Sequence, residues 1–250
     1  IIFSLYISKG LQKNHSSGIL IFFNLYLNRC SMTEIIENYK RILIQIERYN
    51  KEFSATSRNP KLIAVSKTFA EDKIQLVIDQ GHHIFGENKV QEATEKWINL
   101  KQRNKKIELH LIGPLQSNKV KEALEVFDVI QTIDREKIVK KIKNNLNTKQ
   151  IKFFVQVNIG DESQKNGLKI SEVGAFVSWC INDMDLRIDG LMCIPPVDEE
   201  SSYYFNLLSN LKEKLKLEHA SMGMSNDFAK AIQFGATYLR VGSAIFGNRS

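Results

Sequence analysis

The chain has 250 residues, of which 43% are hydrophobic and 25% are charged, and its formal net charge is +7 at pH 7. This composition is typical of a soluble globular domain with a sizeable core, and it argues against a disordered chain or a small fold held by disulfides. The positive charge comes mainly from lysines scattered among glutamates and asparagines, without a nucleic-acid-binding motif, so we expect no specific nucleic-acid partner.

The first 31 residues differ from the rest of the chain because they contain neither Asp nor Glu. Their apolar run over 19–27 is shorter than a membrane-spanning helix requires, so we expect no membrane association. Met32 fits a natural start, and we interpret residues 1–31 as a leader or a mis-assigned start outside the fold. A targeting segment is the alternative. Residues 32–250 are then one domain.

The segment 33–53 is predicted to form an amphipathic helix, because its apolar residues recur at helical spacing. These residues are Ile35, Ile36, Tyr39, Ile42, Leu43, Ile46 and Tyr49. Thr33 is a suitable N-cap for this helix.

After Pro60 the sequence alternates between short apolar runs, typical of strands, and charged amphipathic segments, typical of helices. The predicted strands cover 62–67, 83–88, 107–113, 129–134, 153–160, 186–194, 219–224 and 238–247. The predicted helices begin near Glu71, Lys89, Ser117, Arg135, Ser171, Glu200 and Ser225. Such alternation favours parallel strands, and eight of them predict a single (β/α)8 TIM barrel with an extra N-terminal helix. An open doubly wound sheet is the alternative, although no G-x-G-x-x-G motif follows a first strand.

Functional residues of a TIM barrel lie at the carboxyl ends of its strands, where this sequence has its most unusual side chains. Lys67 ends the first predicted strand, and an amine there is suited to a Schiff base with an aldehyde. Ser225 follows the seventh predicted strand, and Gly242 and Ser243 lie in the eighth. In TIM barrels the segments at the ends of these two strands often bind phosphate. Arg240 shares its side of the strand with Gly242 and could bond a heteroaromatic nitrogen. Together these groups outline pyridoxal 5′-phosphate (PLP).

Other titratable residues form no constellation of their own. They are His82, His83, His110, Asp161 and Glu162. We expect structural or supporting roles for the histidines, a polar loop for the two acids, and no metal site. The three cysteines, Cys30, Cys180 and Cys193, have no metal-ligand or redox spacing, which favours a reducing compartment such as the cytoplasm.

Five segments together resemble the YggS/PROSC family of PLP-binding homeostasis proteins. They read "LIAVSKTF", "FGENKVQE", "HLIGPLQSNK", "GLMCIPP" and "SMGMSNDFAKAIQFGATYLRVGSAIFGN". The resemblance extends over residues 33–248 and implies a barrel similar to the N-terminal domain of bacterial alanine racemase. The sequence departs from the family at Asn166, where a Lys-Ser-Gly segment is common.

The resemblance also implies a role for each site residue. Lys67 would carry PLP as an internal aldimine, and Arg240 would face the pyridine nitrogen. The phosphate would be held by Ser225, Gly242 and Ser243. Asn88 and Met224 would lie near the ring or the phosphate. No residue is assigned a catalytic role.

Three functions from different classes fit these residues. The first is a protein that holds PLP and passes it to apo forms of PLP-dependent enzymes, and we expect this protein to be a cytoplasmic, non-catalytic monomer. The second is a PLP-dependent amino-acid racemase-like enzyme. An arginine at the pyridine nitrogen cannot supply the proton that makes PLP a strong electron sink, which suits a racemase as well as a protein that only holds PLP. We favour the first function because we expect no second domain of the alanine racemase kind, which would supply a catalytic tyrosine base. The third is an interaction protein whose basic surface binds RNA or acidic partners.

Overall fold

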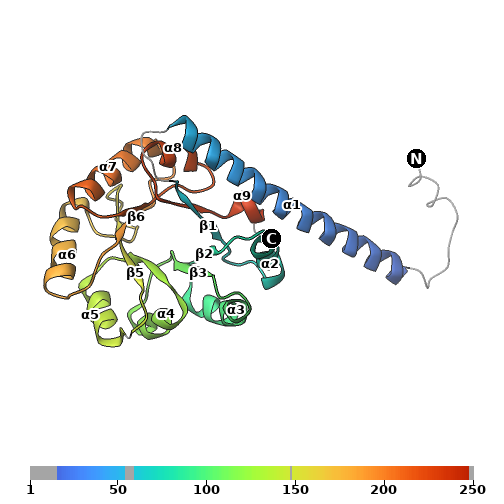
Figure 1. Cartoon of the computed structure of the whole chain (residues 1–250), viewed down its shortest axis with the longest axis horizontal. Helices are drawn as coiled ribbons and strands as arrows, with labels where there is room; N and C mark the ends of the chain where they lie inside the picture. Colours follow the sequence, from blue (N-terminus) through green and yellow to red (C-terminus); the bar gives the residue numbers. More distant parts are fainter. Residues whose placement is uncertain (1–15, 54–58, 147, 248–250) are drawn as a thin grey trace.

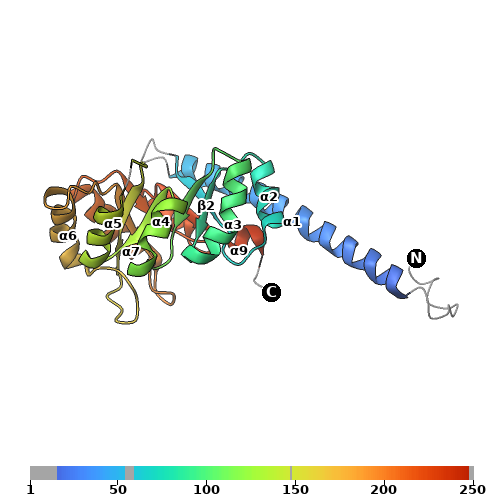
Figure 2. The same cartoon turned by 90° about the horizontal axis from the view of Figure 1, so that it is seen from below.

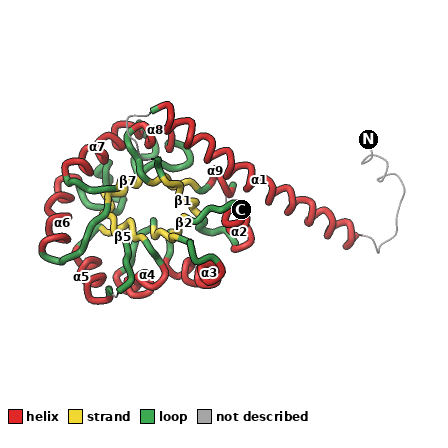
Figure 3. The backbone as a smooth tube through the Cα atoms, viewed as in Figure 1, coloured by secondary structure: helices red, strands yellow, loops and turns green. Residues whose placement is uncertain are grey.

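The computed structural model describes residues 16–53, 59–146 and 148–247, with side chains from residue 32 onward. Eight parallel strands close into a barrel in which each strand pairs with its neighbours in chain order. The strands are β1 Lys61–Val65, β2 Ile84–Glu87, β3 Glu108–Leu111, β4 Val129–Ile133, β5 Lys152–Val157, β6 Gly190–Cys193, β7 His219–Ser221 and β8 Tyr238–Val241. Figure 3 shows them as a ring surrounded by helices. The predicted TIM barrel is confirmed, and the open sheet is excluded because β1 pairs with β8.

The helices follow the strands as the alternation predicted. They are α1 Ser16–Glu52, α2 Glu71–Asp79, α3 Val90–Arg103, the 3-10 helix η2 Ser117–Lys119, α4 Val120–Val126, α5 Glu136–Asn145, α6 Ile170–Asn182, α7 Ser201–Lys214, α8 Phe228–Gln233 and α9 Ser243–Phe246. The predicted strand 238–247 is wrong in its second half. The backbone leaves the extended conformation at Gly242, and the apolar residues that follow form one turn of helix instead of more strand.

Helix α1 covers residues 33–52 of the predicted helix 33–53 but begins earlier, at Ser16, so Thr33 lies inside the helix and is not its N-cap. Figures 1 and 2 show its N-terminal part extending away from the barrel, while its C-terminal part lies beside α2, α8 and α9. Residues 1–15 lie outside the described residues, so the assignment of 1–31 as a leader stays a prediction. Within the described helices, none combines the length and the apolar character that crossing a bilayer would need.

The barrel has two hydrophobic layers that follow from the two-residue period of its strands. One set of side chains points outward and packs under the helices, as Leu62 and Ala64 of β1 do. The other set points inward, as Ile63 and Val65 do together with Tyr238 of β8. Arg240 is in phase with Tyr238 and belongs to the inward set. Lys67 lies in the turn after β1, because the strand ends at Val65, two residues before the predicted strand does.

Candidate functional site

A cavity of about 690 Å³, here called the central cavity, opens at the carboxyl ends of the strands. Its wall includes all the residues that the sequence singled out for a ligand. These are Lys67, Asn88, Met224, Ser225, Arg240, Gly242 and Ser243. They come from segments up to 176 positions apart in the chain, from Lys67 to Ser243, and the closure of the barrel brings them together.

Arg240 places a buried positive charge in this wall. Its side chain is 4% exposed, and it donates hydrogen bonds to Ser221 Oγ at 2.8 Å and to the carbonyl oxygen of Cys193 at 2.7 Å. Burial lowers the pKa of the guanidinium, which still remains charged at neutral pH. No carboxylate lies within ion-pair distance of it among residues 32–53, 59–146 and 148–247. Asp227, which lines the same cavity, acts on Arg240 electrostatically without forming an ion pair with it. A buried charge without an ion-pair partner is costly, so this wall favours an electron-rich ligand.

The loops after β7 and β8 meet at one side of the central cavity. Ser243 Oγ donates to Ser225 Oγ at 3.1 Å, and the backbone N–H of Ala244 donates to the same oxygen at 3.4 Å. Gly242 lies so close to β1 that an added Cβ would be 3.2 Å from Val65 O. Two hydroxyl groups and a closely packed glycine therefore form a small polar pocket that a phosphate group would fit.

Asn88 follows β2 and contributes an unsatisfied polar atom to the wall. Its Oδ1 is buried and has no hydrogen-bond partner in the described part of the chain. Gly113 packs directly on the Asn88 backbone, where an added Cβ would be 2.1 Å from Asn88 O. Because buried polar atoms normally have partners, this oxygen is consistent with a ligand that carries a donor.

A buried polar cluster, absent from the sequence-based predictions, supports the turn that carries Lys67. Lys96 of α3 donates to the carbonyl oxygens of Ser66 at 3.0 Å and Phe69 at 3.2 Å, on both sides of Lys67. The same ammonium lies 2.9 Å from Glu87 Oε1 and 3.1 Å from Glu92 Oε1. Lys96 is 8% exposed and Glu87 is fully buried, so this cluster is part of the core.

The cluster also explains the strained backbone next to Lys67. Thr68 has φ 69°, in the left-handed region that a β-branched residue rarely adopts. Its N–H donates to Glu92 Oε1 at 2.6 Å, and Glu87 accepts from Ser66 Oγ at 2.7 Å. Burial raises the pKa of Glu87, against the opposing effect of Lys96. Side chains of α3 thus hold the turn on the side away from the cavity. The sequence of the turn does not reveal this, because the side chains that bond to Ser66 and Thr68 are more than 20 residues away.

Sequence reasoning also missed the outer part of the central cavity. Glu199, Ser201 and Lys230 line it from α7, α8 and the loop after β6. Lys230 pairs with Glu200 at 2.7 Å, and Glu199 accepts a hydrogen bond from Tyr204. No motif marks these residues, because they reach the cavity from a loop, from the start of α7 and from the middle of α8.

The remaining sequence candidates have other environments. His82 packs against Tyr39 of α1 and Phe85 of β2, and its Nε2 lies 2.8 Å from Ile84 O, which is a structural role. Glu162 forms an ion pair with Lys165 at 2.5 Å in the loop after β5, while Asp161 is exposed. No group of three potential metal ligands occurs in the described residues.

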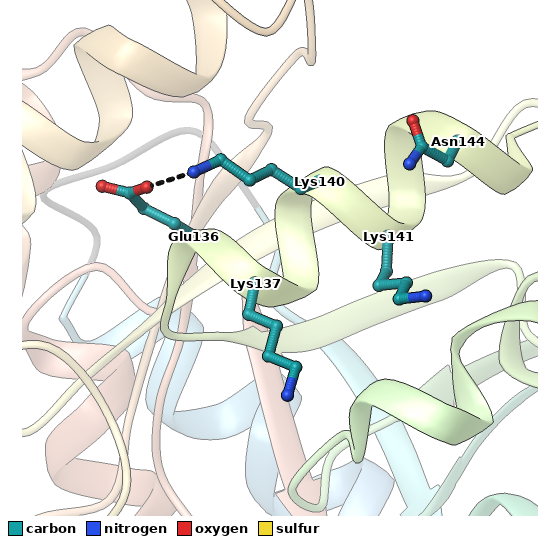
Figure 4. A pocket seen from close by; sticks show the side chains of 5 residues that line it. All are labelled: Glu136, Lys137, Lys140, Lys141 and Asn144. Carbon is teal, nitrogen blue, oxygen red and sulfur yellow. Dashed lines mark hydrogen bonds and ion pairs between the residues drawn. The ribbon is translucent and has the colours of Figure 1, made fainter.

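A second hollow, of about 410 Å³, lies on the outer surface of α5 (Figure 4). All its lining side chains, Glu136, Lys137, Lys140, Lys141 and Asn144, come from that one helix. Glu136 and Lys140 are 58–62% exposed and pair at 2.6 Å, as neighbours one turn apart on a solvated helix do. This hollow brings together no residues that are distant in the sequence, so we assign the functional site to the central cavity.

The chain is similar to a known protein family and to curated proteins over most of its length. The model of the family "Alanine racemase, N-terminal domain" matches residues 43–250. A pyridoxal phosphate homeostasis protein from Pasteurella multocida is 37% identical over 227 residues, covering 86% of this chain and 97% of that protein.

Solved structures with the same barrel include two of PipY from Synechococcus elongatus, which is 29% identical. The structure without PLP has a TM-score of 0.76 and covers 86% of this chain, and the one with PLP bound has 0.68 and covers 81%; both are matched over 100% of their length. Alanine racemase from Acinetobacter baumannii is 16% identical with a TM-score of 0.66, a likeness of fold alone that covers 87% of this chain and 62% of the racemase.

Proposed function

The chain belongs to the family of pyridoxal phosphate homeostasis proteins and carries the alanine racemase N-terminal domain, and from this premise we propose that it binds PLP in the central cavity and takes part in PLP homeostasis. The observation that carries the proposal is the convergence of Lys67, Arg240 and the two serine loops on one cavity. The buried Arg240 charge fits an anionic or electron-rich ligand, and the unsatisfied Asn88 Oδ1 fits a ligand that also carries a hydrogen-bond donor.

Each wall residue has a defined task in this proposal. The amine of Lys67 bonds covalently to the aldehyde carbon of PLP, with loss of one water molecule. Ser225, Ser243 and the space at Gly242 receive the phosphate. Arg240 donates a hydrogen bond to the pyridine nitrogen, while Asn88 and Met224 contact the ring or the phosphate. When bound, PLP supplies an aldehyde that condenses with primary amines.

We further propose that the protein carries PLP without efficient catalysis. The guanidinium of Arg240 cannot give up a proton at neutral pH, so it leaves the pyridine nitrogen neutral and a carbanion weakly stabilised. In the described part of the chain, the lining of the central cavity includes no Tyr, His or Cys that could serve as a second base opposite Lys67. In this proposal the protein works in the cytoplasm as a monomer and delivers PLP to apo forms of PLP-dependent enzymes.

The proposal is tested by adding PLP to the purified protein, recording the absorption spectrum, reducing with borohydride and mapping the labelled peptide. We expect the label on Lys67. Lys67→Ala should fold and lose the label, whereas Lys230→Ala, which removes another lysine of the same wall, should keep it. A label that persists in Lys67→Ala, or no uptake of PLP by the wild type, contradicts the proposal.

A racemase-like activity is the second candidate, favoured by the shared barrel of the alanine racemase N-terminal domain. It is measured as exchange of the α-hydrogen of amino acids for deuterium in the PLP-loaded protein. Exchange at rates typical of enzymes, about 1 per second or faster, would replace the carrier proposal.

A further inference from the structure

The interior of the barrel contains a continuous line of hydrogen bonds that begins at the central cavity. Arg240 donates to Ser221 Oγ at 2.8 Å, and Ser221 Oγ donates to Gln131 Oε1 at 2.7 Å. Gln131 Nε2 lies 2.8 Å from His110 Nδ1, and His110 Nε2 lies 2.8 Å from Glu108 Oε1. We call these five residues the interior chain. Its three middle members are fully buried, where a TIM barrel is usually filled by branched apolar side chains.

The interior chain is anchored at its far end by a charge. Glu108 begins β3, at the end of the barrel opposite the cavity, and its Oε2 accepts from Lys152 Nζ at 3.1 Å. Burial acts to raise the pKa of Glu108, but the hydrogen bonds and charges of His110 and Lys152 outweigh it and lower the pKa to about 2. Glu108 is therefore an anion at neutral pH and can only accept hydrogen bonds.

The chemistry of each member sets the direction of every bond in the chain. A guanidinium has only donors, so Ser221 Oγ must accept from Arg240 and use its single proton toward Gln131 Oε1. The amide of Gln131 then presents its NH₂ group to His110 Nδ1, which must be an acceptor. His110 consequently carries its proton on Nε2, directed at Glu108. Burial lowers the pKa of His110, in keeping with a neutral ring.

We propose that Glu108, His110, Gln131 and Ser221 are positioning residues for Arg240, fixing the guanidinium so that its remaining N–H groups face the central cavity. This inference rests on the proposed function, because it takes the PLP ring to be the acceptor. The carbonyl oxygen of Cys193 holds the guanidinium from a second side at 2.7 Å. The position of Arg240 thus depends on groups that touch no ligand.

A change of tautomer at His110 would alter the hydrogen bonds of Gln131 and Ser221 as well. With a proton on Nδ1, His110 would face the NH₂ group of Gln131, and the amide would have to turn over. Its NH₂ group would then point at Ser221 Oγ, which already accepts from Arg240, and the hydroxyl proton would lose its acceptor. One buried unsatisfied group costs about 1–3 kcal/mol, enough to select one arrangement.

The first test uses the wild-type protein without added ligand. In protein labelled with ¹⁵N-histidine, we expect the His110 ring near neutral pH to show an unprotonated Nδ1 and a protonated Nε2, with its signals assigned by their loss in His110→Asn. The opposite tautomer, or a doubly protonated ring, overturns the inference whether or not the protein binds PLP.

The second test measures the affinity and the absorption maximum of bound PLP in Ser221→Ala and Gln131→Met. We expect Ser221→Ala to weaken binding roughly ten-fold, because it removes a buried hydrogen bond to the charged Arg240. Gln131→Met leaves the Ser221 hydroxyl without its acceptor and should also weaken binding, and both variants should shift the absorption maximum. Thr237→Val is the matched control. It removes another buried hydroxyl, just before β8, which donates to the carbonyl oxygen of Ala220 in β7, and it should change neither the affinity nor the absorption maximum. Glu108→Gln, whose amide oxygen can still accept from His110, should retain more affinity than Glu108→Leu.

A double-mutant cycle separates positioning from loss of stability. In an Arg240→Lys background, Ser221→Ala should change PLP affinity by less than about two-fold, because the group it positions has gone. Full additivity, or wild-type affinity and spectrum in both Ser221→Ala and Gln131→Met, refutes the positioning role. Failure of the wild type to take up PLP refutes the proposed function instead, and leaves the result for His110 standing.

Discussion

Replacing Lys96 by methionine tests whether the turn that carries Lys67 depends on the cluster behind it. The ammonium of Lys96 contacts two backbone oxygens of that turn and two carboxylates, and its side chain is 9% exposed. Removing one partner of a buried ion pair costs about 3–5 kcal/mol. Since whole domains are stable by about 5–15 kcal/mol, we expect a large fall in the free energy of unfolding.

Lys101→Met is the matched control, because Lys101 lies on the same helix and pairs with Asp128 at 2.5 Å. This pair is about a quarter exposed, and Asp128 keeps a second cation, Lys149 at 3.3 Å, so its loss should cost less than the loss of Lys96. Adding Glu87→Gln to Lys96→Met should recover part of the loss, because it removes the carboxylate that was left without a cation.

The assay combines urea unfolding with PLP titration of each variant. Lys96→Met should lower both stability and PLP affinity, whereas Lys101→Met should leave the affinity unchanged. Equal costs for the two variants would show that the buried cluster does not hold the turn. Normal PLP affinity in a destabilised Lys96→Met would show that Lys67 keeps its position without α3.

Three further outcomes follow from single groups. Burial lowers the pKa of His82 from 6.5 to about 4, so stability should fall by up to about 3 kcal/mol as pH drops through this interval, and unfolding curves of His82→Phe should lack that slope. Ser243→Glu should weaken PLP binding roughly ten-fold or more, measured by titration, by placing a carboxylate where the phosphate is proposed; unchanged affinity removes Ser243 from the contact. Burial raises the pKa of both Cys180 and Cys193 to about 12, so peptide mapping should find them alkylated only after unfolding.

The barrel and the gathering of its wall residues could be predicted from the sequence because both depend on local patterns. Alternating strands and helices fix the topology, and the topology puts all carboxyl ends at one rim. The place of Lys67 at this rim follows from its position two residues after the end of β1. The strand over 238–247 was mispredicted because the run after Gly242 is apolar enough for either structure.

The two polar networks could not be predicted, because apart from the local pairs His110–Glu108 and Lys96–Glu92 their links join residues brought together by tertiary packing. Gln131 lies in an ordinary apolar strand, and only the closed barrel brings it to Ser221, 90 positions later. Lys96 has the sequence context of any solvated helix lysine, yet it is buried because α3 packs over the end of β1. A supporting role for His110 was expected, but its partners were not.

The proposed PLP contacts are tied to the closure of the barrel itself. Strands β1 and β8 pair directly, from Lys61 with Tyr238 to Ala64 with Val241, and the chain beyond them carries Lys67 and Gly242. Gly242 packs on Val65, so the proposed phosphate pocket and the amine of Lys67 both lie at the junction of β1 and β8, here called the seam. A ligand that bridges this seam binds only the closed barrel, and it must therefore stabilise the fold by RT ln(1 + [L]/Kd), about 2.7 kcal/mol at 100 times Kd. A protein that holds PLP in this way would be most stable when loaded, and release of the cofactor would not require the barrel to open, because the central cavity already faces outward at the rim.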